Sequence, residues 1–162
     1  MLELKTDTIR ASFSTLGARL VALEFAGADC VMGGGTEEDI LTGDWTTGAV
    51  AGRIAGRITN SRITIDGTDY PLARNFGEHQ LHGGPDNFSI RHWKAEATDG
   101  SIRFSLHSPD GDQGYPGALD VTATNNSRQD ATSSGLAFGI AAIGSNDAYA
   151  RSNSRTTASL GD

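Results

Sequence analysis

The sequence predicts an all-β protein with antiparallel strands. From residue 8 onward, apolar residues recur at every second position, as in Ile9, Ala11 and Phe13, which is the period of a half-buried strand. Two later stretches alternate in the same way and turn back at an Asp-Gly pair, the strongest short-range signal of a β-hairpin. No amphipathic helix of convincing length appears before residue 124. The fold class is therefore all-β with antiparallel sheets.

The expected strands follow one another along the chain. The alternation continues over residues 21–25 and returns over 119–123. Between these runs lie the hairpins RITIDGTDYPL and WKAEATDGSIRFSL, which turn at Asp66-Gly67 and Asp99-Gly100. Two glycine-bearing connections, 43–60 and 73–90, are longer than ordinary turns. Connections of that length in a compact domain are usually functional.

The composition changes near residue 125. From Asn125 to Asp162 there is no Lys, Glu, Val, Trp or Pro, and the apolar alternation stops. Such a composition is typical of weakly structured chain. We therefore divide the protein into a β domain over 1–124 and an atypical, weakly structured tail over 125–162.

Size and charge restrict the expected partners. The 162 residues suit one domain. The net charge is -7 and no basic run occurs, so neither nucleic acid nor an anionic membrane is an expected partner. The first ten residues, MLELKTDTIR, carry four charges where a signal peptide needs an apolar run. We expect a cytoplasmic protein.

Metal and nucleotide sites are not expected. Cys30 is the only cysteine, which excludes an internal disulfide, and its apolar neighbours predict a buried thiol. In SPDGDQGYPG, residues 108–117, Asp110 and Asp112 have the spacing that opens a calcium loop, but Val121 stands where a Glu is required. A turn-rich connection is the better interpretation. The glycine-rich GAVAGRIAGRI, 48–58, lacks the pattern of a phosphate or dinucleotide loop.

Two arginines and one histidine are the candidates for ligand binding. Arg53 and Arg57 could each fork onto vicinal sugar hydroxyls or a carboxylate, or could be surface or ion-paired residues. His82 lies in NFGEHQLHGGPDNF between Phe76 and Phe88. The glycines after it would let a ligand approach the backbone, and aromatic faces stack on sugar rings. The alternative is a hydrogen-bonded structural histidine.

Three stretches in order, GRIAGRI at 52–58, LHGG at 81–84 and SPDGDQGYPG at 108–117, resemble the aldose 1-epimerase (galactose mutarotase) family. RITIDGTDYPL and NFSIRHW resemble it too, so the resemblance covers roughly residues 8–124. It implies a large antiparallel β-sandwich. It also implies interconversion of the α and β anomers of hexoses such as galactose and glucose, without a cofactor.

The resemblance also implies roles for single residues. Anomer interconversion needs a proton donor at the ring oxygen and an acceptor at the anomeric hydroxyl. Arg57 matches the family arginine that binds sugar hydroxyls, and His82 matches the histidine that contacts the sugar close to the reacting centre, a catalytic and substrate-binding role. Arg53 matches the first arginine of the motif, a substrate-binding candidate with a more structural role. Gly56 stands where the family commonly has Asn.

Some family features have no counterpart in this sequence. The family's general acid is a second histidine in an NLTNHxYFNL-like segment, and its general base is a late Glu, whereas no Glu follows Glu96 here. A chain this short, with 37% hydrophobic residues, predicts an incomplete sandwich. We hypothesise that 1–124 is the amino-terminal part of a mutarotase and 125–162 a frameshifted or truncated product. A non-catalytic sugar-binding sandwich and an inactive fragment are the alternatives.

Overall fold

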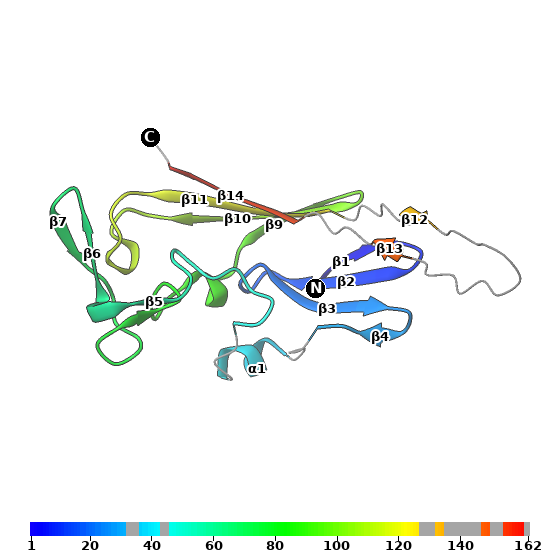
Figure 1. The fold of residues 1–162 in the computed structure, drawn as a ribbon, viewed down its shortest axis with the longest axis horizontal. Coiled ribbons are helices and arrows are strands. Elements are labelled where there is room, and N and C mark those ends of the chain that lie inside the picture. Colours follow the sequence, from blue (N-terminus) through cyan, green and yellow to red (C-terminus); the bar gives the residue numbers. More distant parts are fainter. Residues whose placement is uncertain (32–35, 43–45, 127–131, 135–146, 150–153, 161–162) are drawn as a thin grey trace, which may run out of the picture.

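Two four-stranded antiparallel sheets form the body of the protein (Figure 1). The computed structural model describes residues 1–31, 36–42, 46–126, 132–134, 147–149 and 154–160. The first sheet has the strand order β1 (Leu2–Lys5), β2 (Ile9–Ser14), β3 (Arg19–Phe25) and β4 (Ala28–Asp29). The second has the order β14 (Ser154–Leu160), β11 (Leu119–Asn126), β10 (Ser101–Ser108) and β9 (Lys94–Thr98). The predicted all-β, antiparallel class is confirmed.

Shorter elements connect and extend these sheets. They are α1 (Glu37–Thr42), β5 (Arg57–Ile58), η1 (Thr59–Ser61), β6 (Arg62–Ile65), β7 (Thr68–Pro71), β8 (Gln80–Leu81), η2 (Phe88–Ile90), η3 (Asp112–Gly114), β12 (Thr132–Ser134) and β13 (Asp147–Tyr149). The β6–β7 hairpin stands at one end of the molecule, beyond the two sheets (Figure 1). No helix in the described part of the chain has the length and hydropathy needed to cross a membrane.

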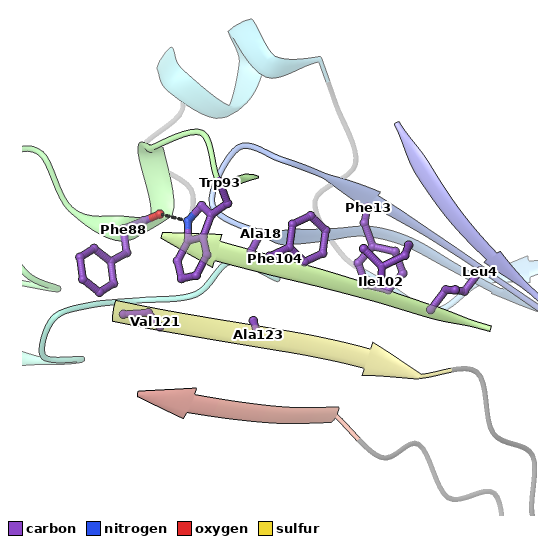
Figure 2. Packing of buried hydrophobic residues seen from close by; sticks show 9 residues of the cluster. All are labelled: Leu4, Phe13, Ala18, Phe88, Trp93, Ile102, Phe104, Val121 and Ala123. Carbon is purple, nitrogen blue, oxygen red and sulfur yellow. Dashed lines mark hydrogen bonds between the residues drawn. The ribbon is translucent and has the colours of Figure 1, made fainter. Parts of the chain in front are cut away.

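The core lies between the two sheets, where their inner faces meet (Figure 2). Its buried members are Leu4, Phe13, Ala18, Phe88, Trp93, Ile102, Phe104, Val121 and Ala123. The rings of Phe13 on β2 and Phe104 on β10 have centroids 6.2 Å apart, so this pair joins the sheets. The side chains at 102, 104, 121 and 123 are buried because alternate residues of β10 and β11 face the same side. This is the alternation that the sequence predicted.

Both predicted hairpins are confirmed. In the first, Ile65 pairs with Thr68 across a two-residue turn, and Asp66 and Gly67 both have positive φ, at 49° and 79°. That backbone matches the right-handed twist of the flanking strands, and Asp-Gly is among the pairs that adopt it most readily. The second hairpin joins β9 to β10, with Thr98 opposite Ser101.

Two details differ from the sequence expectations. Cys30 is exposed, so the prediction of a buried thiol is wrong. The residue follows the two-residue edge strand β4, both of whose residues are exposed. The long connections 43–60 and 73–90 also contain more regular structure than expected, because β5 and β8 pair with each other.

The boundary near residue 125 falls inside a strand. β11 continues to Asn126, and β14 pairs with it from Leu119 to Asn125. Within the predicted tail, 127–131, 135–146, 150–153 and 161–162 lie outside the described residues. The division at 124 and the weakly structured tail therefore stay predictions.

Candidate functional site

The β5–β8 pair brings the two candidate motifs together. Arg57 on β5 lies opposite Leu81 on β8, and Ile58 lies opposite Gln80. His82 is the next residue after β8, so the arginine of one motif stands beside the histidine of the other. That Arg57 and His82 share a substrate site stays a prediction.

Two hydrogen bonds with Gly56 fix the half-buried His82. The His82 N–H donates to the Gly56 carbonyl oxygen at 2.9 Å, and the Gly56 N–H donates to His82 Nδ1 at 3.1 Å. An Nδ1 that accepts a hydrogen bond carries no proton, so the neutral ring carries its proton on Nε2. His82 also has positive φ, at 52°. The local structure thus sets both the tautomer and the backbone of this histidine, and Nε2–H is the group that remains for a ligand oxygen.

The glycines after His82 serve the chain's own packing. A Cβ on Gly83 would lie 1.8 Å from the Gly52 carbonyl oxygen, and one on Gly84 would lie 2.7 Å from Gln113 Oε1. Both glycines have positive φ, at 99° and 102°. The sequence suggested that they admit a ligand, whereas the group that approaches them is another part of the protein. Gly83 packs the LHGG loop against the segment that carries Arg53, and Gly84 packs it against Gln113.

Arg57 is exposed and presents its guanidinium over an aromatic ring. Its Cζ lies 4.6 Å from the ring centroid of Phe76, which is itself 48% exposed. Among the described residues, no hydrogen bond or ion pair of the Arg57 side chain is found. Its five N–H donors are therefore available for a ligand.

Arg53, four residues earlier, has the opposite environment. Its Nε donates to Ser108 Oγ at 2.9 Å, and Nη2 donates to the Ser108 and Pro109 carbonyl oxygens at 3.0 and 2.7 Å. Nη1 donates to the carbonyl oxygens of Gly117 at 2.7 Å and Pro116 at 3.3 Å. Burial lowers the pKa of this guanidinium. These contacts favour the structural role, and substrate binding by Arg53 stays a prediction.

An ion pair extends this network to Arg91, the residue that follows η2. Asp112 accepts two hydrogen bonds from Arg91, both at 2.7 Å, and a third from Ser108 Oγ. The Arg91 hydrogen bonds are the largest influence that lowers the pKa of Asp112 to about 2. Ser108 therefore links Asp112 to Arg53, and the loop after β10 is tied to the segment before β5.

Asp110 has a different task in the same loop. Its Oδ1 accepts the Gly117 N–H at 2.5 Å, which closes the turn around η3. Neither Asp110 nor Asp112 joins a metal cluster, because no group of three or more His, Cys, Asp or Glu side chains in the described part of the chain is placed to hold an ion. The loop is turn-rich, as the sequence predicted.

A buried pair behind the site was missed at the sequence level. Gln80 on β8 is fully buried; its Nε2 donates to the Ala73 carbonyl oxygen at 3.0 Å, and its Oε1 accepts from the Tyr115 hydroxyl. Burial raises the pKa of Tyr115 to about 12. The only signal available was a polar residue directly before LHGG.

Phe88 and two further histidines have structural partners of their own. Phe88 is 3% exposed and belongs to the core, so its ring is not a platform for a ligand. His79 Nδ1 accepts the Asn60 N–H at 3.0 Å, at the far end of the β5–β8 pair. His107 pairs with Asp120 at 2.7 Å on an exposed strand face.

Comparison with known proteins identifies the family. The aldose 1-epimerase family model matches residues 1–128. The chain belongs to the aldose 1-epimerase family. Galactose mutarotase from Sus scrofa is 37% identical over 127 residues, which are 75% of this chain and 37% of that protein. Aldose 1-epimerase from Escherichia coli K12 is 49% identical over 76 residues, which are 46% of this chain and 22% of that enzyme.

Solved structures show the same fold. An aldose epimerase homologue from C. elegans superposes with a TM-score of 0.71 at 31% identity, over 77% of this chain and 41% of that one. Galactose 1-epimerase from Lactobacillus acidophilus superposes with a TM-score of 0.66 at 25% identity, over 76% and 38%. The chain thus spans less than half the length of each of these four relatives. The predicted galactose mutarotase-like fold is confirmed.

Proposed function

We propose that this chain binds an aldose hexose at Arg57 and His82 and takes part in the interconversion of its anomers. Family membership supports sugar epimerase chemistry. The main support for this site is the pair of hydrogen bonds between Gly56 and His82. They orient the ring and leave its proton on Nε2, and Gly56 is followed on β5 by Arg57, whose donors are available.

The two side chains have separate tasks in this proposal. The Arg57 guanidinium forks onto adjacent hydroxyls and fixes the position of the sugar. The Nε2–H of His82 donates to a sugar oxygen near the anomeric carbon and stabilises the charge that develops as the ring opens. The reaction moves one proton from the anomeric hydroxyl to a base and one from an acid to the ring oxygen, and reclosure from the other face gives the second anomer.

A second candidate is sugar binding without turnover. It is favoured by one observation: the arrangement supplies positioned donors, the guanidinium of Arg57 and the Nε2 of His82. Binding needs only positioned donors, whereas turnover needs an acid and a base as well. The preferred hexose, the cytoplasmic location and the absence of nucleic-acid and membrane partners stay predictions.

Polarimetry separates the two candidates. Freshly dissolved α-D-galactose is mixed with the full chain, and the decay of optical rotation is compared with the uncatalysed decay. Acceleration that is lost in His82→Ala supports the enzyme. As a matched control, His107→Ala removes an exposed histidine outside the site and should leave the rate unchanged. Uncatalysed decay together with galactose binding would support the binding protein.

A further inference from the structure

We propose that Phe76 is a positioning residue for Arg57: its ring holds the guanidinium flat, so that the N–H donors face the sugar hydroxyls. The inference rests on the proposed function and names how that site is organised. It starts from the contrast between two arginines of one motif. Arg53 is held by hydrogen bonds to the chain, whereas Arg57 is held by the ring of Phe76.

A stacked arginine keeps all its donors. The guanidinium is planar, its faces interact with aromatic rings, and its hydrogen bonds form in the plane. With Cζ 4.6 Å from the Phe76 centroid, the contact is well within the range of a cation–π interaction. A carboxylate partner would restrain the side chain equally well, but it would occupy the edge that a sugar needs. An aromatic support is therefore suited to a binding arginine.

The loop that carries Phe76 is itself fixed. Phe76 and His79 exchange backbone hydrogen bonds, each at 3.0 Å. Asn75 closes the base of this loop, because its Nδ2 donates to the Leu81 carbonyl oxygen at 2.9 Å and its Oδ1 accepts the Leu81 N–H at 2.7 Å. Leu81 is the strand partner of Arg57. The ring and the arginine are thus built on the same pair of strands.

The exposure of Phe76 has no explanation in the core. Its ring is 48% exposed and is not a member of the hydrophobic cluster between the sheets. Phe88, at the other end of the same segment, is 3% exposed and packs there. Within the described part of the chain, the only role that the structure suggests for this ring is its contact with the Arg57 guanidinium. We therefore assign Phe76 the task of orienting Arg57.

The test compares galactose affinities of the full chain and its variants by NMR titration. Phe76→Leu removes the aromatic face but keeps an apolar side chain, and it should weaken binding about two- to fivefold, the usual size of an exposed cation–π contact. Phe76→Tyr keeps the face and should restore binding. Phe25→Leu is the matched control, since Phe25 is 54% exposed on β3, and it should bind like the unsubstituted chain.

A double variant separates positioning from direct contact. If Phe76 acts through Arg57, the variant Arg57→Ala/Phe76→Leu binds no more weakly than Arg57→Ala alone. The proposal would be overturned if the double variant lost affinity by the product of the two single-variant losses. It would also be overturned if Phe76→Leu alone left the galactose affinity unchanged.

A sugar-free readout keeps this proposal distinct from the proposed function. The side-chain protons of Arg57 should show an upfield ring-current shift that disappears in Phe76→Leu and persists in Phe76→Tyr. If the unsubstituted chain binds no galactose, the proposed function fails, and the ring-current shift alone decides whether Phe76 holds Arg57. Absence of that shift in the unsubstituted chain would refute the stacking directly.

Discussion

Replacing Asp112 with Asn tests the polar network that supports the site. The Asp112 and Arg91 side chains are only 8% and 16% exposed, and Arg91 Nη1 lies 2.7 Å from the carboxylate. The pKa of Asp112 is lowered from 3.8 to about 2, so the ionised carboxylate contributes about 2 kcal/mol to folding at neutral pH. Removal of the charge also leaves Arg91 with the exposed Asp86 alone as an ion-pair partner among the described residues. We expect Asp112→Asn to cost about 2 to 3 kcal/mol at pH 7.

The stability difference between the unsubstituted chain and Asp112→Asn should depend on pH. The pKa of Asp112 is lower in the folded than in the unfolded protein, so its contribution is fully present above about pH 4 and is lost as the pH falls through 2. The free energies of unfolding of the two proteins, measured by urea titration and tryptophan fluorescence, should therefore converge between pH 4 and pH 2. Asp69→Asn is the control, because its pair with Arg62 has side chains 50% and 63% exposed and is worth less than about 1 kcal/mol.

A destabilisation that is the same at pH 7 and pH 2.5 would refute the reasoning, because it would assign the loss to packing and not to charge. So would an Asp112→Asn variant that is no less stable than Asp69→Asn at pH 7.

Five further substitutions test the fold and the two arginines. Gly83→Ala should abolish the folded state in circular dichroism, since its Cβ would meet a backbone oxygen at 1.8 Å, whereas Gly111→Ala, in open space at a similar φ, should cost only about 1 to 2 kcal/mol. Arg53→Ala should lower the free energy of unfolding by about 2 to 4 kcal/mol, because it removes the hydrogen bonds that Arg53 makes with Ser108, Pro109 and Gly117. Arg57→Ala, which removes only the contact with Phe76 among the described residues, should lower it by less than about 0.5 kcal/mol. Phe104→Ala, fully buried between the sheets, should cost about 3 to 5 kcal/mol in the same urea titration.

The sequence was sufficient for the features that depend on local pattern. Alternation over Ile9, Ala11 and Phe13 and the Asp66-Gly67 turn specify strand faces and hairpin geometry within a few residues. The positions of Arg57 and His82 were predicted from motifs. Their juxtaposition depends on β5 and β8, strands of two residues each, which are too short to show any period.

The different roles of the two arginines could not be read from the motif either. Arg53 and Arg57 occur in the same Gly-Arg-Ile context, but Ser108 and Gly117, more than 50 residues away, accept hydrogen bonds from Arg53 alone. The exposure of Cys30 was wrongly predicted for a related reason. Apolar neighbours indicate burial only when another layer covers them, and β4, at the edge of its sheet, has both of its residues exposed.

Saturation-transfer NMR with D-galactose on the full chain tests the central claim most directly. If Arg57 and His82 form a sugar site, the unsubstituted chain transfers saturation to galactose. Arg57→Ala and His82→Ala should then each reduce the signal strongly, while His107→Ala leaves it intact. A chain that is folded by circular dichroism but transfers nothing, or one whose signal survives both substitutions, would contradict the account.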